Sequence, residues 1–287
     1  FLHPMPRPYR TPVRSATRLW VGHDLAVDDA ALARLAHLNY LDFARQSTPW
    51  SDTGRLEEGG GVLLGRSGTE FPFVFNAVAR TDPSVAPSEV LARADAFFGA
   101  RGYTLITHPG DDQDLHAHAE SLDLFAFGTS PEMVCRERLA DVERTDGIVL
   151  RRATDEADIA DFVSVGSAAY PSLGMPATAM SEAITRFDRL LEPHIAVVVA
   201  YDDDRPVAAA QAFLSHGIAG VYWVGTLEEA RGKGLGEAVC RWVTNWAFDQ
   251  GAAAQTLQAS TMGESIYLRM GYETIYRYTS WFRSGER

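Results

Sequence analysis

Short runs of mostly apolar residues, bounded by turn-forming residues, recur in the second half of the chain, which is the pattern of buried strands. Strands are predicted at residues 148–153, 195–201, 206–214, 218–226, 256–259 and 272–282. The connections at 202–205 and at His216-Gly217 are made of turn-forming residues, so several of these strands follow one another closely. The pattern predicts a sheet built largely from consecutive strands.

Between the predicted strands, apolar residues recur at the spacing of helices. The clearest helix is predicted at 235–250, where apolar residues recur on one face and Gly251 supplies a stop. Shorter helices are predicted at 180–191 and 264–270. A further helix follows Thr154-Asp155-Glu156, which offer a cap and acidic groups to its first turn. The predicted order of this half is β-α-α-β-β-β-α-β-α-β.

The first half repeats a looser version of this order. Helices are predicted at 28–45, 88–99 and 114–122, a hairpin at 61–65 and 71–79, and strands at 103–108 and near Phe125. The charged stretch 136–147 lies between two apolar runs and places a boundary near Asp146. We therefore predict an α/β fold with a mixed α+β sheet, made of two tandem units at residues 1–146 and 147–287.

Composition narrows the class of protein. The chain has 287 residues, 46% of them hydrophobic, which is typical of a globular protein with one or two domains. No apolar run is long enough for a membrane span, and residues 1–18 lack the apolar core of a signal peptide, so a cytoplasmic location is expected. The net charge of −12 disfavours nucleic acid and anionic membranes as partners.

The two cysteines, Cys135 and Cys240, are far apart in the sequence and have no close His or Cys neighbours. Paired or clustered cysteines would indicate a disulfide or a zinc site. We expect both to be reduced and packed in the interior, and we expect no metal site.

The segment that points to chemistry is Arg231-Gly232-Lys233-Gly234-Leu235-Gly236-Glu237, at the start of the long predicted helix. Its three glycines allow positive φ angles and leave the backbone bare, so successive N–H groups can point into one concavity. A helix N-terminus has unpaired donors and a positive dipole end, which suits a pyrophosphate. Arg231 and Lys233 add positive charge. The segment predicts an anion site.

Two common phosphate motifs do not fit this turn. A Walker P-loop needs Ser or Thr after the lysine, where this chain has Gly234. A dinucleotide fingerprint beginning at Gly232 needs Gly or Ala at position 237, where this chain has Glu237. A glycine-rich helix start that serves only close packing stays as the structural alternative.

A second segment identifies the anion. Residues 257–272 join a strand end to a short helix that stops at Gly271, with Tyr267 four residues earlier. Together the two segments closely resemble the GNAT acetyltransferase superfamily. The turn matches its Arg/Gln-x-x-Gly-x-Gly/Ala motif, Tyr267 with Gly271-Tyr272 matches its tyrosine-x-x-x-Gly-aromatic signature, and Ser260 stands where the family often has asparagine.

This resemblance covers residues 147–282 and implies a sheet splayed open between the strand that ends at Thr226 and the strand at 256–259. Acetyl-CoA, as co-substrate, would lie in the splay. The backbone of Val224, Gly225 and Thr226 would hold the pantetheine as an added strand would. The family pattern assigns the pyrophosphate to the amides of Gly232, Gly234, Leu235, Gly236 and Glu237, with Arg231, Lys233 and Ser260 as further cofactor-binding residues.

The family resemblance also assigns a catalytic residue, because a tyrosine at the Tyr267 position gives a proton to the departing thiolate. Many relatives carry a glutamate base on the strand that ends here at Thr226, but this strand has no carboxylate. Glu228, Glu229 and His216 are nearby, and no base is assigned. Tyr222 and Trp223 are expected to alternate faces, with one ring lining the acceptor pocket.

The tandem arrangement resembles mycothiol synthase and other two-domain GNAT proteins, in which one copy can lose its cofactor site. In the first half, the place of the phosphate turn is residues 80–87, which have no glycine, two prolines and an aspartate. We expect this copy to bind no CoA and to wall the acceptor pocket, with Asn76 and His108-Pro109-Gly110 as lining candidates. Gly59-Gly60-Gly61 is interpreted as a flexible entry to a hairpin.

The predicted function is transfer of an acetyl group from acetyl-CoA to a primary amine of a small molecule by direct attack, in a monomer or homodimer. Two alternatives stay open: a non-catalytic sensor or scaffold that binds acyl-CoA, and an acyltransferase that uses a longer acyl chain.

Overall fold

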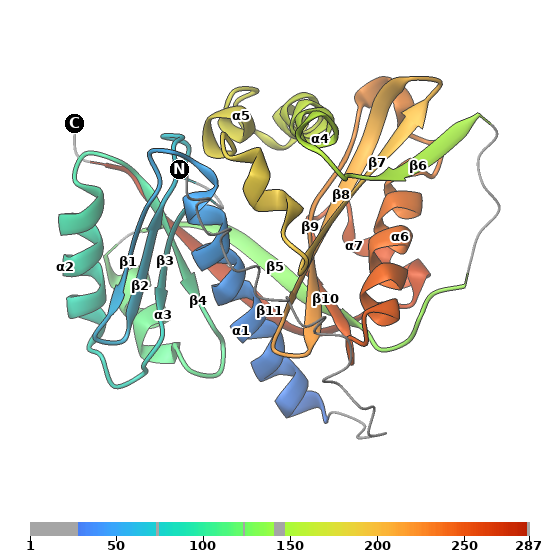
Figure 1. The fold of residues 1–287 in the computed structure, drawn as a ribbon. Helices are drawn as coiled ribbons and strands as arrows, with labels where there is room; N and C mark the ends of the chain where they lie inside the picture. Colours follow the sequence, from blue (N-terminus) through green and yellow to red (C-terminus); the bar gives the residue numbers. More distant parts are fainter. Residues whose placement is uncertain (1–27, 73–74, 123, 141–146, 286–287) are drawn as a thin grey trace, which may run out of the picture.

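The computed structural model describes residues 28–72, 75–122, 124–140 and 147–285, and Figure 1 shows their arrangement. These residues contain one eleven-stranded mixed sheet, in the order β1-β2-β3-β4-β11-β5-β10-β9-β8-β7-β6. The predicted boundary near Asp146 and the N-terminal segment expected to lack a signal peptide lie outside the described residues. The predicted mixed α/β fold is confirmed.

The second half forms one side of this sheet and its helices. Its elements are β6 (Ile148–Arg152), α4 (Glu156–Ala169), η2 (Tyr170–Leu173), α5 (Ala179–Ala183), η3 (Phe187–Leu191), β7 (Ile195–Asp202), β8 (Arg205–Ser215), β9 (Ile218–Thr226), η4 (Glu228–Ala230), α6 (Leu235–Asp249), β10 (Gln255–Gln258), α7 (Glu264–Met270) and β11 (Glu273–Arg283). Strands β6 to β9 form an antiparallel meander, and β10 runs parallel to β9. Helices α4 and α6 lie on opposite sides of β7–β9 (Figure 1).

One predicted helix of this half is wrong. The segment 180–191 is not a single helix, because α5 ends at Ala183 and the chain is extended at Ile184 before the 3₁₀ turn η3. The Trp50 carbonyl oxygen accepts hydrogen bonds from the N–H groups of Thr185 and Arg186, at 2.9 and 2.7 Å. These two donors are therefore taken by the first half of the chain instead of by helical partners.

The first half contains α1 (Asp29–Ser47), η1 (Thr48–Trp50), β1 (Arg55–Gly59), β2 (Val62–Arg66), β3 (Asn76–Arg80), α2 (Pro87–Phe98), β4 (Tyr103–Thr107), α3 (Gln113–Ser121) and β5 (Phe125–Cys135). Strand β1 is not predicted by the sequence pattern, because all five of its residues are exposed and give no alternation. Gly59-Gly60-Gly61 is therefore the turn of the β1–β2 hairpin, with positive φ at each glycine, and its interpretation as a flexible entry is wrong.

The two halves exchange strands at the centre of the sheet. Strand β11, from the end of the second half, lies between β4 and β5 of the first half. Strand β5, from the first half, lies between β10 and β11 of the second half. Figure 1 shows green β5 and red β11 crossing between the blue-green part and the orange part. The division at residue 146 stays a prediction, and the hydrogen bonding of each part depends on a strand from the other.

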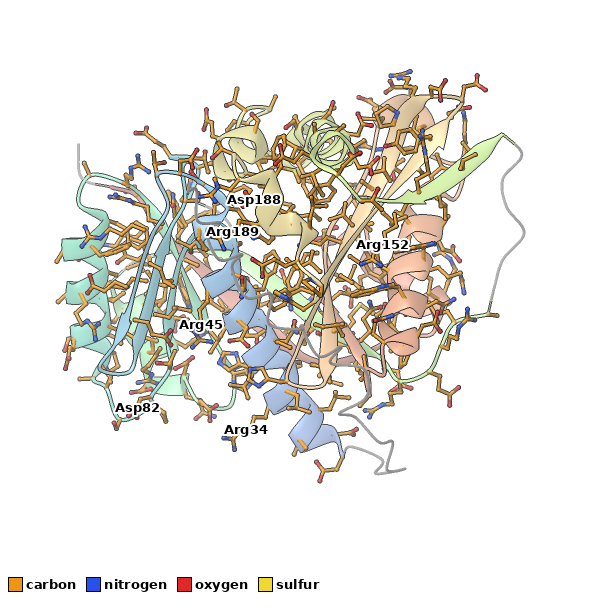
Figure 2. All side chains as sticks on the ribbon, in the orientation of Figure 1. Arg34, Arg45, Asp82, Arg152, Asp188 and Arg189 are labelled. Carbon is orange, nitrogen blue, oxygen red and sulfur yellow. The ribbon has the colours of Figure 1, made fainter. Side chains whose placement is uncertain are left out.

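Helix α1 joins the two parts from one face of the sheet (Figure 1). Asp28 caps it by accepting a hydrogen bond from the Ala31 N–H at 2.7 Å. Arg45, labelled in Figure 2, forms an ion pair with Glu58 of β1. On the other side, Phe43 belongs to the large hydrophobic core around β7–β9. The helix is therefore fixed to both halves.

Both cysteines are buried and free, as expected. Among the described residues, no helix is long and apolar enough to cross a membrane.

Candidate active site

The sheet is open between β9 and β10. The two strands pair only from Ala219 with Gln255 to Val221 with Leu257. Beyond Val221, β9 continues to Thr226 with only β8 as its partner among the described strands. The last part of β9 therefore borders an opening, and its backbone groups on that side are not used by strand pairing. The splay that the family resemblance implies is present.

A bulge at Trp223 bends the end of β9 beside this opening. Trp223 has a φ of 56°, which is uncommon for a large side chain, and the register against β8 shifts there. The Tyr170 hydroxyl donates a hydrogen bond of 3.1 Å to the carbonyl oxygen of Val224. The backbone that borders the opening is therefore fixed from the α4 side.

The bulge also interrupts the expected alternation of Tyr222 and Trp223. The Tyr222 ring stacks on Phe43, with 3.5 Å between ring centroids, and the Trp223 ring stacks on Phe75 at 4.8 Å. Both phenylalanines belong to the first half. An extra residue at a bulge breaks the two-residue period of a strand, so both rings contact the first half.

The glycine turn lies at the start of α6. Gly232 and Gly234 have φ angles of 77° and 74°, and a Cβ added to either would meet nothing within 4 Å. These two glycines are therefore needed for backbone conformation rather than for close packing. Gly234 is the N-cap residue, and Ala238 is the first residue whose N–H bonds back to it, at 3.0 Å. The preceding amides of the first turn are the donors that a helix leaves unpaired.

Gly236 is required for a different reason, which is close packing. A Cβ added there would lie 3.2 Å from Oγ1 of Thr226, at the end of β9. The absence of a side chain lets the first turn of α6 approach the strand that borders the opening. Close packing therefore explains one of the three glycines, and the opening and the helix N-terminus are adjacent.

The two cations of the turn are both engaged with protein oxygens. Arg231 donates to the Thr226 carbonyl and the Ala169 carbonyl, each at 3.3 Å, and to Ser172 Oγ at 2.8 Å. Lys233 is half-exposed, with Nζ 3.8 Å from Asp202. Arg231 therefore ties the turn to the end of α4, and the contribution of either charge to anion binding stays a prediction.

Tyr267 lies on α7 and packs against the core around α6. Burial, followed by the neighbouring Cys240 and Tyr170, raises the pKa of the Tyr267 hydroxyl well above its usual range, so the phenol keeps its proton at neutral pH. Ser260 begins this segment, and its Oγ accepts a hydrogen bond from the Gly263 N–H at 3.2 Å. The catalytic role of Tyr267 and the cofactor contact of Ser260 stay predictions.

Residues 193–274, which include β9, the glycine turn, α6 and Tyr267, match the family model of the acetyltransferase (GNAT) domain. This segment is a GNAT acetyltransferase domain. The predicted superfamily and the predicted class, a transferase enzyme, are confirmed. An acyl-CoA is the co-substrate typical of this family.

Solved structures show the same fold across both halves. The chain resembles a GCN5-related N-acetyltransferase from Kribbella flavida, with a TM-score of 0.62, 21% identity, and coverage of 88% of this chain and 96% of that chain. A GCN5-related N-acetyltransferase from Sphaerobacter thermophilus gives a TM-score of 0.58 at 12% identity, covering 78% and 76%. A GNAT-family protein from Novosphingobium aromaticivorans gives 0.54 at 16% identity, covering 87% and 99%. A search of curated protein sequences found no match.

A hollow of about 400 Å³ lies beside the glycine turn of the GNAT domain, on the side of the β7–β8 connection. Its lining is Asp202, Asp203, Asp204, Arg205, Val207, Glu229, Ala230 and Lys233. Four carboxylates face two cations there, so the hollow does not suit a phosphate.

The three base candidates near β9 do not gather at the opening of the GNAT domain. His216 forms a 2.8 Å pair with Asp42 at the beginning of β9, whereas the opening lies at its end. Glu229 pairs with Arg205 on the surface, and Glu228 is exposed. None of these residues is assigned as the base.

The two lining candidates of the first half have different positions. Asn76 is fully buried and bonds to Ser67, Thr69 and Phe71 within its own hairpin, so its expected lining role is wrong. Its side chain holds the β2–β3 connection together. The other candidate, His108-Pro109-Gly110, lies beside a strand of the second half. The centroid of the His108 ring is 4.9 Å from the centroid of the Tyr276 ring on β11.

Glu132 of β5 is a residue that the sequence reasoning missed. It is 0% exposed, and Gln258 Nε2, at the end of β10, donates to its Oε2 at 2.6 Å. The signal in the sequence was a lone carboxylate directly before the apolar residues Met133-Val134-Cys135. That pattern does not reveal which strand will lie beside it. Among the described residues, no group of His, Cys, Asp and Glu is arranged to hold a metal ion.

Proposed function

We propose that this protein transfers an acetyl group from acetyl-CoA to the primary amine of a small molecule, by direct attack of the amine on the thioester. The observation that carries this proposal is the adjacency of the opening at the end of β9 to the glycine turn at the N-terminus of α6. A cytoplasmic location and a monomeric or homodimeric state stay predictions.

In this proposal the glycine turn and the end of β9 bind different parts of the cofactor. The amides of Gly232, Gly234, Leu235, Gly236 and Glu237 hold the pyrophosphate, and the backbone of Val224, Gly225 and Thr226 holds the pantetheine and thioester. Backbone donors are the main source of this binding, because the Arg231 guanidinium already bonds to three oxygens. Arg231, Lys233 and Ser260 complete the proposed cofactor site.

Tyr267 is proposed to be the general acid. The nitrogen–carbon bond forms as the carbon–sulfur bond breaks, and the electron pair of that bond goes to sulfur. The departing thiolate then takes the phenolic proton of Tyr267. The phenol is protonated at neutral pH and therefore carries the proton that the sulfur needs.

The rings around Trp223 favour a short acyl group. Trp223 is stacked on Phe75 and has the Tyr170 ring edge-on at 5.4 Å. This bulge adjoins Val224, where the thioester is proposed to lie, so little space is left for a long chain. Acetyl therefore fits better than a longer acyl group.

The first half is proposed to bind no CoA. Arg80, at the end of β3, is buried and pairs with Asp112 and Asp114, while it also donates to the carbonyl oxygens of Val85 and Asp111. The connection from β3 to α2 is thereby closed by protein contacts. Pro87 at the first position of α2 removes a donor that a phosphate would need.

Calorimetry with CoA tests the cofactor site. In Gly234→Asp the new carboxylate repels the pyrophosphate, and we expect affinity to fall at least about tenfold. Gly251→Asp is the matched control, because Gly251 also has a positive φ and free space but lies at the other end of α6. Unchanged affinity in Gly234→Asp would overturn the proposed site.

Release of free CoA from acetyl-CoA in the presence of a panel of primary amines tests turnover. The proposal expects release that depends on at least one amine. Tight CoA binding without release for any amine would instead support the alternative of an acyl-CoA sensor.

A further inference from the structure

Five polar side chains form one row across the middle of the sheet. Tyr276 of β11 is in register with Glu132 of β5, and Glu132 is in register with Gln258 of β10. On the next two strands of the sheet, Tyr222 of β9 is in register with Gln211 of β8. Residues in register on neighbouring strands share a face, so each of the two groups faces one side of the sheet.

The opening of the GNAT domain divides this row between Gln258 and Tyr222. The last paired residues of β10 and β9 are Leu257 and Val221, and Gln258 and Tyr222 are the next residue on each strand. Extension of this register by one residue places the two side chains on the same face, which completes the row. Glu132, bonded to Gln258 at 2.6 Å, therefore lies at the edge of the opening where the thioester is proposed to arrive.

Several buried polar atoms of this region have no hydrogen-bond partner within the described part of the chain. They are both side-chain polar atoms of Gln211, together with Glu132 Oε1 and Thr256 Oγ1, and the Thr256 hydroxyl lies close enough to the Glu132 carboxyl to lower its pKa. Glu132, Gln211 and Thr256 are each 0% exposed. Buried polar groups normally have a partner, and groups without one mark places where a ligand or water belongs. Their position on both sides of the opening indicates a polar ligand there.

The surroundings of Glu132 are hydroxyl groups rather than cations. The titratable groups near it are Tyr40 of α1, Tyr222 of β9, and Tyr276 and Tyr278 of β11. Burial raises the pKa of each of these tyrosines, so all are neutral near pH 7. Farther along, His37 Nδ1 lies 2.7 Å from the Tyr278 hydroxyl, and burial lowers the pKa of His37 to about 4, so it is neutral as well.

Without a cation nearby, burial raises the pKa of Glu132 to about 8. A general base works best when its pKa is close to the operating pH, because it then combines basicity with an available unprotonated form. The Gln258 amide and the Thr256 hydroxyl lie at this carboxyl and lower its pKa, but burial outweighs both, and Oε1 can accept a proton. Glu132 thus has both the position and the basicity that the residues on β9 lack.

We propose that Glu132, supplied by the first half of the chain, is the general base of the GNAT domain and contacts the amine of the acceptor. The proposal rests on the proposed function. The amine nitrogen loses one proton to Glu132 Oε1 as its bond to the acetyl carbon forms. The sulfur of CoA gains one proton from Tyr267 as its bond to that carbon breaks. Solvent then removes the proton from Glu132 and restores the one on Tyr267, so the reaction is balanced.

Kinetics on Glu132→Gln test the proposal, with Glu273→Gln as control, because Glu273 is exposed on the neighbouring strand β11. Release of CoA is measured from about pH 6 to about pH 9.5 with alkylamines, benzylamine and amino acid esters as acceptors. Loss of a general base lowers kcat/KM for the amine by about 10²- to 10⁴-fold. In Glu132→Gln we expect unchanged affinity for CoA. The rise of activity with pH near pH 8, which the wild type shows, is absent in this variant. Glu132→Asp keeps a carboxylate and restores part of the rate.

Infrared spectroscopy gives a readout that does not need turnover. The C=O stretch of a protonated buried carboxyl is expected near pH 7 in the wild type with CoA bound, and it is absent in Glu132→Gln. Saturation with an amine from the panel removes this band as Glu132 loses its proton. A band that no amine alters, or wild-type rates in Glu132→Gln, would overturn the role of Glu132. Failure of the wild type to bind CoA would instead overturn the proposed function.

Discussion

Tyr222, on β9 of the GNAT domain, donates a hydrogen bond of 2.9 Å to the side-chain oxygen of Asn39, on α1 of the first half. The Asn39 amide nitrogen in turn donates to the Phe213 carbonyl at 3.2 Å and to Ser215 Oγ at 3.0 Å. Asn39 is 0% exposed, so one side chain of the first half satisfies three polar groups of the second. The pair fixes α1 against β8 and β9, on one side of the opening.

Replacement of Asn39 by leucine is therefore expected to destabilise the whole chain. Loss of its hydrogen bonds leaves up to three polar groups unpaired, each costing about 1–3 kcal/mol, so the free energy of unfolding falls by about 3 kcal/mol or more. Urea unfolding followed by tryptophan fluorescence measures this change. Arg34→Leu is the control, because Arg34 is exposed near the free end of α1 (Figure 2). A cost below about 1 kcal/mol in Asn39→Leu would contradict the role of this contact.

The strand exchange predicts that the two halves depend on each other. A fragment of residues 147–287 lacks β5, so β10 loses one of its two partners and β11 loses both. Unpaired strand edges promote aggregation. We expect this fragment alone to be insoluble or unable to bind CoA, and co-expression with residues 1–146 to restore binding. A fragment that binds CoA with full affinity on its own would show that the exchange is not needed.

Stability as a function of pH tests the state of Glu132. Its pKa is about 8 in the folded chain, against an ordinary value of 4.5. The folded state therefore keeps a proton that the unfolded state loses, and stability falls as the pH rises from about 4.5 to about 8. In Glu132→Gln this loss disappears, so the variant gains on the order of 4 kcal/mol relative to the wild type between pH 5 and pH 8.5.

Urea unfolding of both proteins at the two pH values measures that gain. Comparison of the two proteins cancels the effect of groups that they share, such as His37, whose lowered pKa gives pH dependence of the opposite sign. An equal pH dependence in the wild type and the variant would show that the pKa of Glu132 is ordinary.

Tyr267→Phe tests the general acid. The variant keeps the ring that packs against the core but lacks the proton, so kcat is expected to fall about 10²-fold or more with unchanged CoA affinity. Tyr201→Phe is the control, because the Tyr201 hydroxyl bonds to Asp161 on α4 and not at the opening. Full activity in Tyr267→Phe would remove this residue from the proposed mechanism and leave the cofactor site intact.

Local patterns were sufficient for most elements of the second half. The predicted helix at 235–250 is α6, and the predicted strands at 195–201, 206–214 and 218–226 are β7, β8 and β9 within a residue or two. Periodicity and turn residues act over short distances, so the chain shows them directly. Prediction failed where distant groups decide the backbone, as at Thr185 and Arg186, whose N–H groups bond to Trp50.

The sequence by itself determined the glycine turn, the Tyr267 segment and therefore the acetyltransferase family, because these features depend on residue types at fixed local spacing. Only the tertiary structure decided that the last strands of the two halves change places, and that Glu132 lies beside Gln258 at the opening. Strand order and burial arise from contacts between residues more than 100 positions apart, and no local pattern encodes which strands will meet. The same burial, away from any cation, gives an ordinary glutamate the pKa of a base.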